Sequence, residues 1–207
     1  MGEASKRKKA GLYPDTSKPK WNYGRAWSAL VEAVRAGRAG TPADPLSDKA
    51  ASFIATLVPG GVPVRLPFTN VSPAYKSGYC QMNVNHRVLN EGGERVDGWM
   101  IWESPAFVDA ESHAVWRDAD GNLIDLTPRA DNEPEILFLP DPTARVERIT
   151  LNGVDTDRML CNRTSMSDCP YTKFGQPVEG PFRDETYTEE ERRLMKSVFG
   201  VETAAST

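Results

Sequence analysis

The sequence predicts an α+β fold, in which helices pack on an antiparallel sheet. Segments in the first half of the chain have apolar residues at helical spacing, and several short segments after residue 94 alternate apolar and polar residues. Segments with period two that are joined by short turns pair as antiparallel strands. Helices grouped before a run of strands are typical of the α+β class.

The chain has 207 residues, which suits one domain with extended tails. We expect a disordered basic arm over residues 1–20, a single domain over residues 21–200 and a disordered tail over residues 201–207. The arm carries six Lys or Arg against two Asp or Glu, whereas the whole chain has a net charge of −4. The acidic body argues against nucleic acid as a partner, apart from contacts of the arm.

The cysteine count and the apolar pattern bear on the compartment. Three cysteines, Cys80, Cys161 and Cys169, are too few and odd in number for a disulfide framework, which favours a reducing environment. No apolar run reaches the roughly 18 residues of a membrane-spanning helix, and no apolar stretch follows the charged start as in a secretory signal. We therefore expect a cytoplasmic protein with no membrane partner.

Helices are expected before and after the strands. Ser47 is a good N-cap for a helix that the "PGG" run ends, and Thr188 and Glu191 form a capping box for another. A further helix begins near Ser77 and ends at Gly92, and it carries the chemistry discussed below. The remaining expected helices cover residues 21–37, 47–58 and 189–200.

Strands are expected where apolar residues alternate or form short runs. In "RVDGWMIWES", Val96, Gly98, Met100 and Trp102 fall on one face, and Trp99 and Ile101 fall on the other. After residue 155 the alternation weakens, so loops that hold Cys161 and Cys169 are expected over residues 155–185. The expected strands cover residues 62–68, 95–104, 111–117, 122–127, 136–141 and 145–151.

His113 and Asp125 lie on the two arms of one predicted hairpin, across the turn "DADG". With a five-residue loop His113 is directly opposite Asp125, and with a three-residue loop Asp125 is its diagonal neighbour on the same face. A loop of two or four residues would place them on opposite faces. The spacing of 12 residues therefore permits a hydrogen bond between the two side chains but does not require it.

Cys80 is the nucleophile that such a pair would activate. It lies in the first turn of its helix, on one face with Val84 and Val88. The partial positive charge and unpaired N–H groups at a helix start lower the pKa of a thiol and stabilise an oxyanion. A carboxylate behind a histidine fixes its tautomer and stabilises the imidazolium. Taken singly, Cys80 also suits a core, His113 a structural hydrogen bond and Asp125 a turn cap.

Residues 79–128 resemble a group of bacterial and phage proteins of unassigned function. The motifs are "YCQMNVNHRVLNEGG", "GWMIWES" and "AESHAVWRDADGNLIDLTP", which cover about a quarter of the chain. The group has C-H-x-N-V at the first motif, so Gln81 departs from its pattern. Many members also carry a Cys-rich C-terminal zinc motif, which this chain lacks. The resemblance therefore implies no metal and no cofactor here.

The chain also distantly resembles protein N-terminal glutamine amidohydrolases, in keeping with the Cys, His, Asp order of papain-like and transglutaminase-like thiol enzymes. Those amidohydrolases carry C-x-x-N-V on a helix, an I-W strand, and then His and Asp-Leu in successive strands. The resemblance implies that Cys80 is the nucleophile, His113 the general base and then acid, and Asp125 the orienting carboxylate. The implied reaction is attack on a glutamine-type or peptide amide through a thioester, with water or an amine as the acceptor. The matching residues are Cys80, Asn83, Val84, Ile101, Trp102, His113, Asp125 and Leu126.

Four further residues are expected near the substrate, which would be a protein or peptide with a glutamine or other amide group. Gln81 and Asn83 follow Cys80 on the helix, and Asn83 would bind either the substrate or the start of the helix. Trp99 and Trp102, together with Trp116, would form the wall of an apolar cleft or pack in the core.

Two functions from other classes are open. A zinc site would use Cys80, His113, Cys161 and Cys169, although the last two are farther apart in sequence than the ligands of a zinc knuckle. A non-catalytic binding protein, such as a phage- or host-directed inhibitor on the same fold, would need no reactive thiol. Replacement of Cys80 by Ala distinguishes an inhibitor, which keeps its activity, from an enzyme.

Overall fold

The structure, a computed structural model, describes residues 39–129, 133–144, 146–151, 153–171, 178, 180–186 and 193. Within these residues the chain is α+β, as the sequence predicts, with helices α3 (Asp48–Leu57) and α4 (Cys80–Glu91). The expected arm, first helix and tail lie outside the described residues, as does the expected last helix apart from Arg193. Neither described helix has the length and apolar character of a membrane span.

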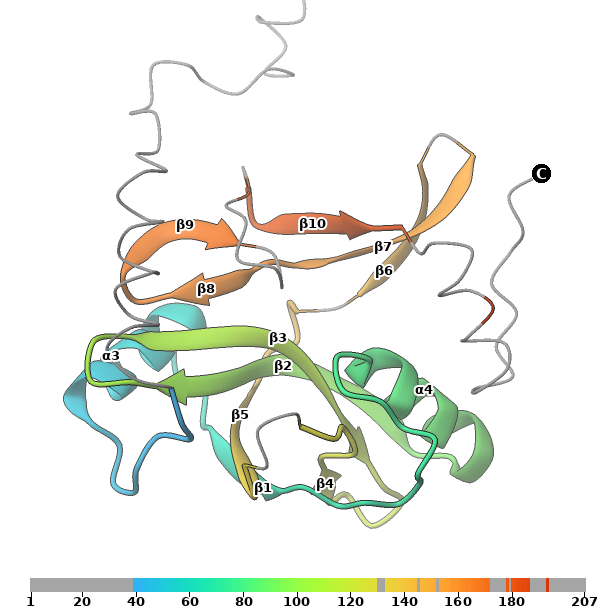
Figure 1. Cartoon of the computed structure of the whole chain (residues 1–207), viewed down its shortest axis with the longest axis horizontal. Coiled ribbons are helices and arrows are strands. Elements are labelled where there is room, and N and C mark those ends of the chain that lie inside the picture. The colour runs from blue at the N-terminus through green and yellow to red at the C-terminus, as the bar shows by residue number, and fades with distance from the viewer. Residues whose placement is uncertain are drawn as a thin grey trace, which may run out of the picture.

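The described strands form two antiparallel sheets. The main sheet has the order β1-β5-β2-β3-β8-β9, with β4 also paired to β3, and the smaller sheet has the order β10-β7-β6. Figure 1 shows the smaller sheet beside β8 and β9, beyond the β3 side of the main sheet. The strands are β1 (Val64–Pro67), β2 (Glu94–Glu103), β3 (Val108–Arg117), β4 (Leu123–Ile124), β5 (Glu135–Pro140), β6 (Glu147–Leu151), β7 (Val154–Leu160), β8 (Asn162–Thr164), β9 (Ser167–Tyr171) and β10 (Phe182–Glu185).

Strands occupy much of the segment 155–185, so the expectation of loops there is wrong. Cys161 separates β7 from β8, and Cys169 lies within β9. The strand β7 buries Thr156 and Asp157 beside Met159, and these polar residues break the apolar alternation by which a strand is recognised. The strands β8, β9 and β10 are also only three to five residues long, too short for a clear period.

The helix α3 begins where the sequence predicts. The Ser47 hydroxyl accepts a hydrogen bond from the Ala50 N–H at 3.0 Å, which satisfies one of the unpaired donors of the first turn. Ala50 and Ile54 then face the main sheet, and the expected inner residues Phe53, Leu57 and Val58 pack around them. The buried sheet residues in this cluster are Trp99, Ile101, Val108, Ala110, Leu137 and Leu139.

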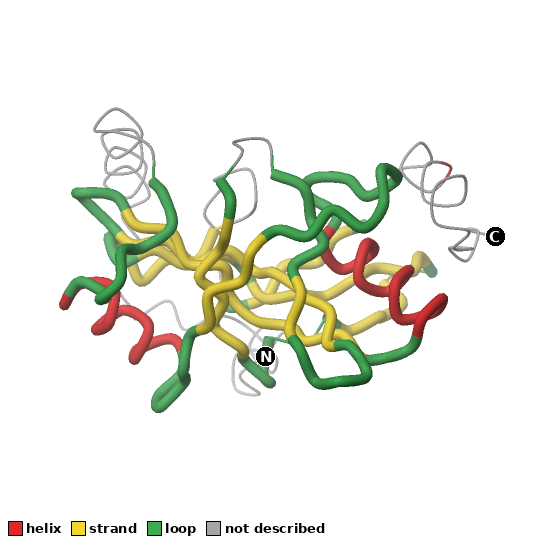
Figure 2. The backbone as a smooth tube through the Cα atoms, turned by 90° about the horizontal axis from the view of Figure 1, so that it is seen from below, coloured by secondary structure: helices red, strands yellow, loops and turns green. Residues whose placement is uncertain are grey.

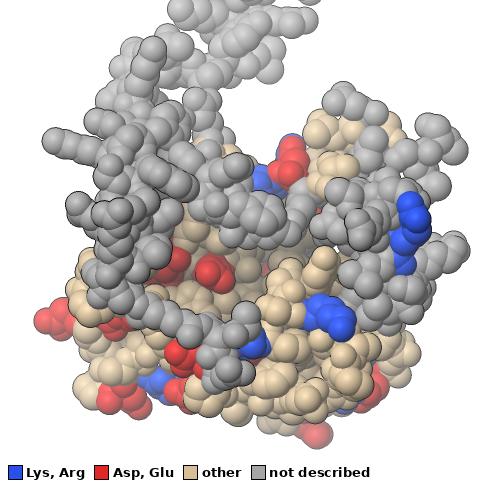
Figure 3. All heavy atoms as spheres, viewed as in Figure 1, with Lys and Arg blue, Asp and Glu red and all other residues tan. Residues whose placement is uncertain are grey.

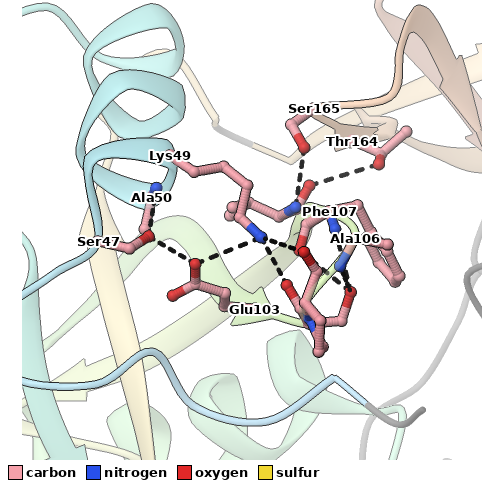
Figure 4. A network of polar contacts seen from close by, with 11 residues as sticks. Ser47, Lys49, Ala50, Glu103, Ala106, Phe107, Thr164 and Ser165 are labelled. Atoms are coloured by element: carbon pink, nitrogen blue, oxygen red, sulfur yellow. Dashed lines mark hydrogen bonds and ion pairs between the residues drawn. The ribbon is translucent and has the colours of Figure 1, made fainter. Parts of the chain in front are cut away.

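A network of polar contacts attaches α3 to the turn between β2 and β3 (Figure 4). The Lys49 ammonium donates hydrogen bonds to the Ser104 and Pro105 carbonyls at 2.6 and 3.2 Å. It also lies 3.5 Å from the Glu103 carboxylate, which accepts a hydrogen bond from Ser47 at 2.5 Å. The network therefore fixes the direction of α3 relative to the sheet that it covers.

The helix α4 covers the same face of the main sheet at its other end (Figure 2). Its buried residues Cys80 and Val84 pack with Ala114, Trp116 and Leu126, as the predicted four-residue repeat requires. The helix ends at Gly92, whose φ of 75° is a conformation that favours glycine. The following Gly93 lies so close to β3 that an added Cβ would be 2.2 Å from the Arg117 carbonyl oxygen.

The strands β2 and β3, of ten residues each, form a hairpin, and its register decides which side chains share a face. Gly98 pairs with His113, so these two residues point to the same side, and Trp99 points to the side covered by the helices. A Cβ on Gly98 would lie 2.3 Å from the Leu139 carbonyl oxygen. Glycine is therefore required for the close approach of β2 and β5 across from His113.

The main sheet closes on itself at the β1 end. Phe68, just after β1, forms a parallel bridge with Asp125, just after β4, and the Thr69 N–H donates to the Asp125 carbonyl at 2.9 Å. The strands β1, β5, β2, β3 and β4 thus form a ring, and the face opposite the helices lies inside it. The buried apolar residues of that interior are Leu66, Met100, Trp102, Val115, Ile136 and Phe138.

Candidate active site

The hairpin register brings His113 and Asp125 together. Trp116 pairs with Ile124 and Arg117 pairs with Leu123, which leaves Asp125 as the diagonal neighbour of His113. Of the two loop lengths that would place both on one face, the structure therefore has the three-residue loop. The His113 Nε2 atom lies 3.1 Å from Asp125 Oδ1, and the two residues are 4% and 0% exposed. This buried hydrogen bond fixes the orientation of the imidazole.

Cys80 lies beside His113 and changes its protonation. Burial by itself disfavours the imidazolium, but the charge interaction with Cys80, hydrogen bonds to Asp125 and Cys80, and the charge of Asp125 outweigh it. Together they raise the pKa of His113 to about 10. Because Asp125 occupies Nε2, the ring nitrogen left for the sulfur is Nδ1. Cys80, His113 and Asp125 therefore form one continuous chain of side-chain contacts.

The Asp125 carboxylate has partners for both oxygens. Oδ1 accepts from His113 and from the Thr127 N–H at 3.2 Å, and Oδ2 accepts from the Arg129 guanidinium. Burial alone would raise the pKa of Asp125, but the hydrogen bond and charge of His113 and the charge of Arg129 hold it below its usual value. Asp125 therefore stays ionised behind His113 at neutral pH.

Gln81 contacts the sulfur directly. The Cys80 sulfur lies 3.1 Å from Gln81 Oε1. Cys80 itself is 7% exposed, and Gln81 is half-buried.

Asn83 stabilises the start of α4. Its Nδ2 donates to the Lys76 carbonyl at 2.9 Å and to Thr127 Oγ1 at 3.2 Å, and its Oδ1 accepts from the Lys76 N–H. The residue is fully buried. Of the two roles expected for Asn83, these contacts match attachment to the helix start, and they connect Cys80 to the segment that follows Asp125.

The structure separates the tryptophans that were expected near the substrate. Trp102 lies inside the strand ring on the His113 side, where the Arg129 guanidinium is 5.9 Å from its ring centre. Trp99 lies on the opposite face, where its Nε1 donates to Asp141 at 2.8 Å. Trp116 packs beside Cys80 under α4 and donates to the Gly92 carbonyl. Trp99 therefore points away from the face of the sheet that carries His113.

A separate cavity of about 540 Å³ lies next to Trp99 and α3. Cys161, which is fully buried, is among its lining residues, as are Lys49 and Arg163. None of the triad residues lines this cavity. Among the described residues no group of three or more His, Cys, Asp or Glu is arranged to hold a metal ion.

Other residues around His113 have no obvious signal in the sequence. The Phe138 ring of β5 lies edge-on to the imidazole with 6.3 Å between ring centres, and Phe138 is fully buried. Glu111 shares the His113 face of β3, and burial raises its pKa against the opposing charges of His113, Arg183 and Arg129. Arg129 follows Asp125 by four residues, and this closeness in sequence is the only signal that could have placed it at the site.

Farther along β3, a buried carboxylate is hydrogen-bonded to a tyrosine. Asp109 accepts a hydrogen bond from the Tyr171 hydroxyl of β9, and burial raises the pKa of Asp109 to about 7. The same burial and the charge of Asp109 raise the pKa of Tyr171. This pair joins β9 to β3, the strand that also carries His113.

Comparisons of the chain with protein-family models, curated proteins and solved structures find no match. The charge distribution is also unspecific: on the face shown in Figure 3, acidic and basic side chains of the described residues are interspersed. That face therefore presents no field of one sign that would attract a polyanion.

Proposed function

We propose that the protein is a thiol-dependent amidohydrolase or acyl transferase that acts on a glutamine-type or peptide amide. The observation that carries the proposal is the buried chain of contacts from Cys80 to His113 to Asp125. A helix that presents a cysteine at its start to a sheet that presents histidine and aspartate is the arrangement of papain-like and transglutaminase-like thiol enzymes. A core cysteine needs neither an oriented histidine nor an ionised carboxylate behind it.

The reaction follows from the positions of the groups. The Cys80 thiolate attacks the carbonyl carbon of the amide, and a sulfur–carbon bond forms. The His113 imidazolium donates its proton to the amide nitrogen, the carbon–nitrogen bond breaks, and ammonia or an amine leaves. The thioester is then attacked by water or an amine, His113 removes a proton from the attacking group, and the thiolate is released. Asp125 keeps the imidazole oriented throughout both steps.

The start of α4 supplies the charge stabilisation that this step needs. Its N-cap, Tyr79, makes no side-chain hydrogen bond to the first turn. The N–H groups of that turn are therefore available to the oxyanion that forms on the attacked carbonyl beside Cys80. The helix dipole favours both the thiolate and the oxyanion at the same place.

The proposal is tested by ammonia release and covalent labelling. Peptides with a terminal or an internal glutamine are incubated with the wild type and with Cys80→Ala, with and without a fluorescent primary amine as acceptor. We expect ammonia release, or amine incorporation, that is lost in Cys80→Ala. A glutamine-like chloromethyl ketone should label Cys80 and spare Cys161, which is fully buried. Release that persists without Cys80, or absence of labelling at Cys80, would refute the proposal.

A further inference from the structure

Arg129 makes more contacts than its position in a loop after β4 suggests. Its Nη2 bonds to Asp125 Oδ2, its Nη1 points to the Met100 sulfur at 3.4 Å, and its Nε points to the Glu133 carbonyl at 3.4 Å. The guanidinium also lies over the Trp102 ring, and its side chain is only 7% exposed. A buried cation is costly to desolvate. The four contacts, above all the ion pair with Asp125, offset that cost.

We propose that Arg129 is a positioning residue of the Cys80–His113–Asp125 site, which fixes the carboxylate that orients the histidine. Arg129 occupies the carboxylate oxygen that faces away from His113, so the other oxygen is directed at His113 Nε2. Rotation of the Asp125 carboxyl group would break the contact to Arg129 as well as the contact to His113. The inference rests on the function proposed above and adds a fourth member to its machinery.

The charges of the four residues support this role. A thiolate, an imidazolium, an aspartate and a guanidinium cancel, whereas the first three alone would leave a net negative charge in a buried place. The charge of Arg129 also contributes to the lowered pKa of Asp125. Other charged groups face the cluster, since Glu111 of β3 interacts with His113 and Arg129, and Arg183 of β10 interacts with Glu111. Of the two arginines, Arg129 is the one that contacts Asp125 directly.

The site is closed around Arg129 in a way that favours arginine over lysine. A guanidinium is planar, so it can stack on Trp102 while its edge donates to Asp125. An ammonium in the same place would keep the charge but could not make the stack and the contacts to Met100 and Glu133 together. Lysine should therefore restore the ionisation of Asp125 but only part of its orientation.

The test compares Arg129→Gln and Arg129→Lys with Arg158→Gln. Arg158 forms a two-fold hydrogen bond with Asp184 at 2.8 and 2.9 Å on the surface, so its removal controls for the loss of an Arg–Asp pair away from the triad. The first readout is the Asp125 carboxyl carbon chemical shift against pH, assigned with Asp125→Asn. The second is the rate at which iodoacetamide alkylates Cys80 between pH 5 and pH 9. Neither readout needs a substrate.

In Arg129→Gln we expect the pKa of Asp125 to rise, because the cation that favours its charged form is gone. The folded protein then loses the Asp125 charge at a higher pH as the pH falls, so the acid limb of the Cys80 alkylation profile moves to higher pH. We expect alkylation at pH 6 to slow by about ten-fold, which Arg129→Lys partly restores. Arg158→Gln should match the wild type.

The outcomes separate this inference from the proposed function. A normal Asp125 titration and an unchanged alkylation profile in folded Arg129→Gln would overturn the role of Arg129. If Arg129→Gln does not fold, Arg129→Lys decides: a wild-type alkylation profile would show that Arg129 contributes only charge and would overturn the positioning role. Absence of amide turnover by the wild type would refute the proposed function. The two readouts above would still report on Arg129 in that case.

Discussion

Replacement of Cys80 by Ala is expected to lower the rate of amide turnover by roughly 10³-fold or more and to leave the fold intact. The reason is that the attacking atom is removed, whereas the buried partners His113 and Asp125 keep their hydrogen bond. The rate is measured as ammonia or thioester-derived product, and the fold is checked by circular dichroism. Cys161→Ala is the matched control. Cys161 lines the cavity beside α3, away from the triad, so this variant should keep the wild-type rate of amide turnover.

A double variant, in which both Cys80 and His113 are replaced by Ala, tests whether the two residues act together. Residues that act as one unit in a mechanism give non-additive losses, so His113→Ala should be almost as inactive as Cys80→Ala, and the double variant hardly worse than either. Losses that multiply in the double variant would show that Cys80 and His113 act independently. That result would contradict the paired thiolate and imidazolium.

The largest effect on stability is expected for Phe138→Ala, at about 3–5 kcal/mol in the free energy of unfolding. Phe138 is fully buried inside the strand ring and packs edge-on to His113. Its removal leaves a cavity that the surrounding strands cannot close, since their backbones are paired on both sides. Urea unfolding measures the loss.

Phe182→Ala is the matched control for this change. Phe182 is 47% exposed on β10, so the same substitution should change the free energy of unfolding by less than about 1 kcal/mol. Similar losses at the two positions would mean that the interior of the ring is not the core. Phe138→Ala at a temperature where it remains folded should also widen the environment of His113 and slow any reaction at Cys80.

The two described helices and the central hairpin could be predicted because each has a local signal. Ser47 is a capping residue, and Gly92 ends α4 in a conformation that favours glycine. The alternation around Trp99 and Trp102 assigns their faces correctly. These signals depend on residues within one or two turns of each other, which is why the sequence alone reveals them.

The site could be predicted only in part. The chain order of Cys80, His113 and Asp125 is visible, but the loop length that decides their register is not, because two loops satisfy the same spacing. Closure of the sheet between Phe68 and Asp125 joins residues 57 positions apart, and no local pattern indicates it. Phe138 becomes a neighbour of His113 through the pairing of β5 with β2 and of β2 with β3, which are far apart in sequence.

The strands between residues 155 and 185 were missed for a different reason. Polar residues such as Thr156 and Asp157 are buried there, and a pattern that relies on apolar alternation has nothing to detect. Trp99 is expected near the substrate because it clusters in sequence with Trp102 and Trp116, and the structure places it on the face of the sheet opposite Trp102.

The central claim, that Cys80 and His113 form an ion pair held by Asp125, is tested most directly by the titration of the His113 imidazole. The chain has only two histidines, so His86→Ala assigns both ring signals in a nitrogen–proton correlation spectrum recorded from pH 5 to pH 11. In the wild type we expect His113 to keep its positive charge until about pH 10. In Cys80→Ala the charge interaction and hydrogen bond of Cys80 are lost while burial remains, so the pKa of His113 should fall. Titration of His113 at the same pH in both proteins would contradict the account.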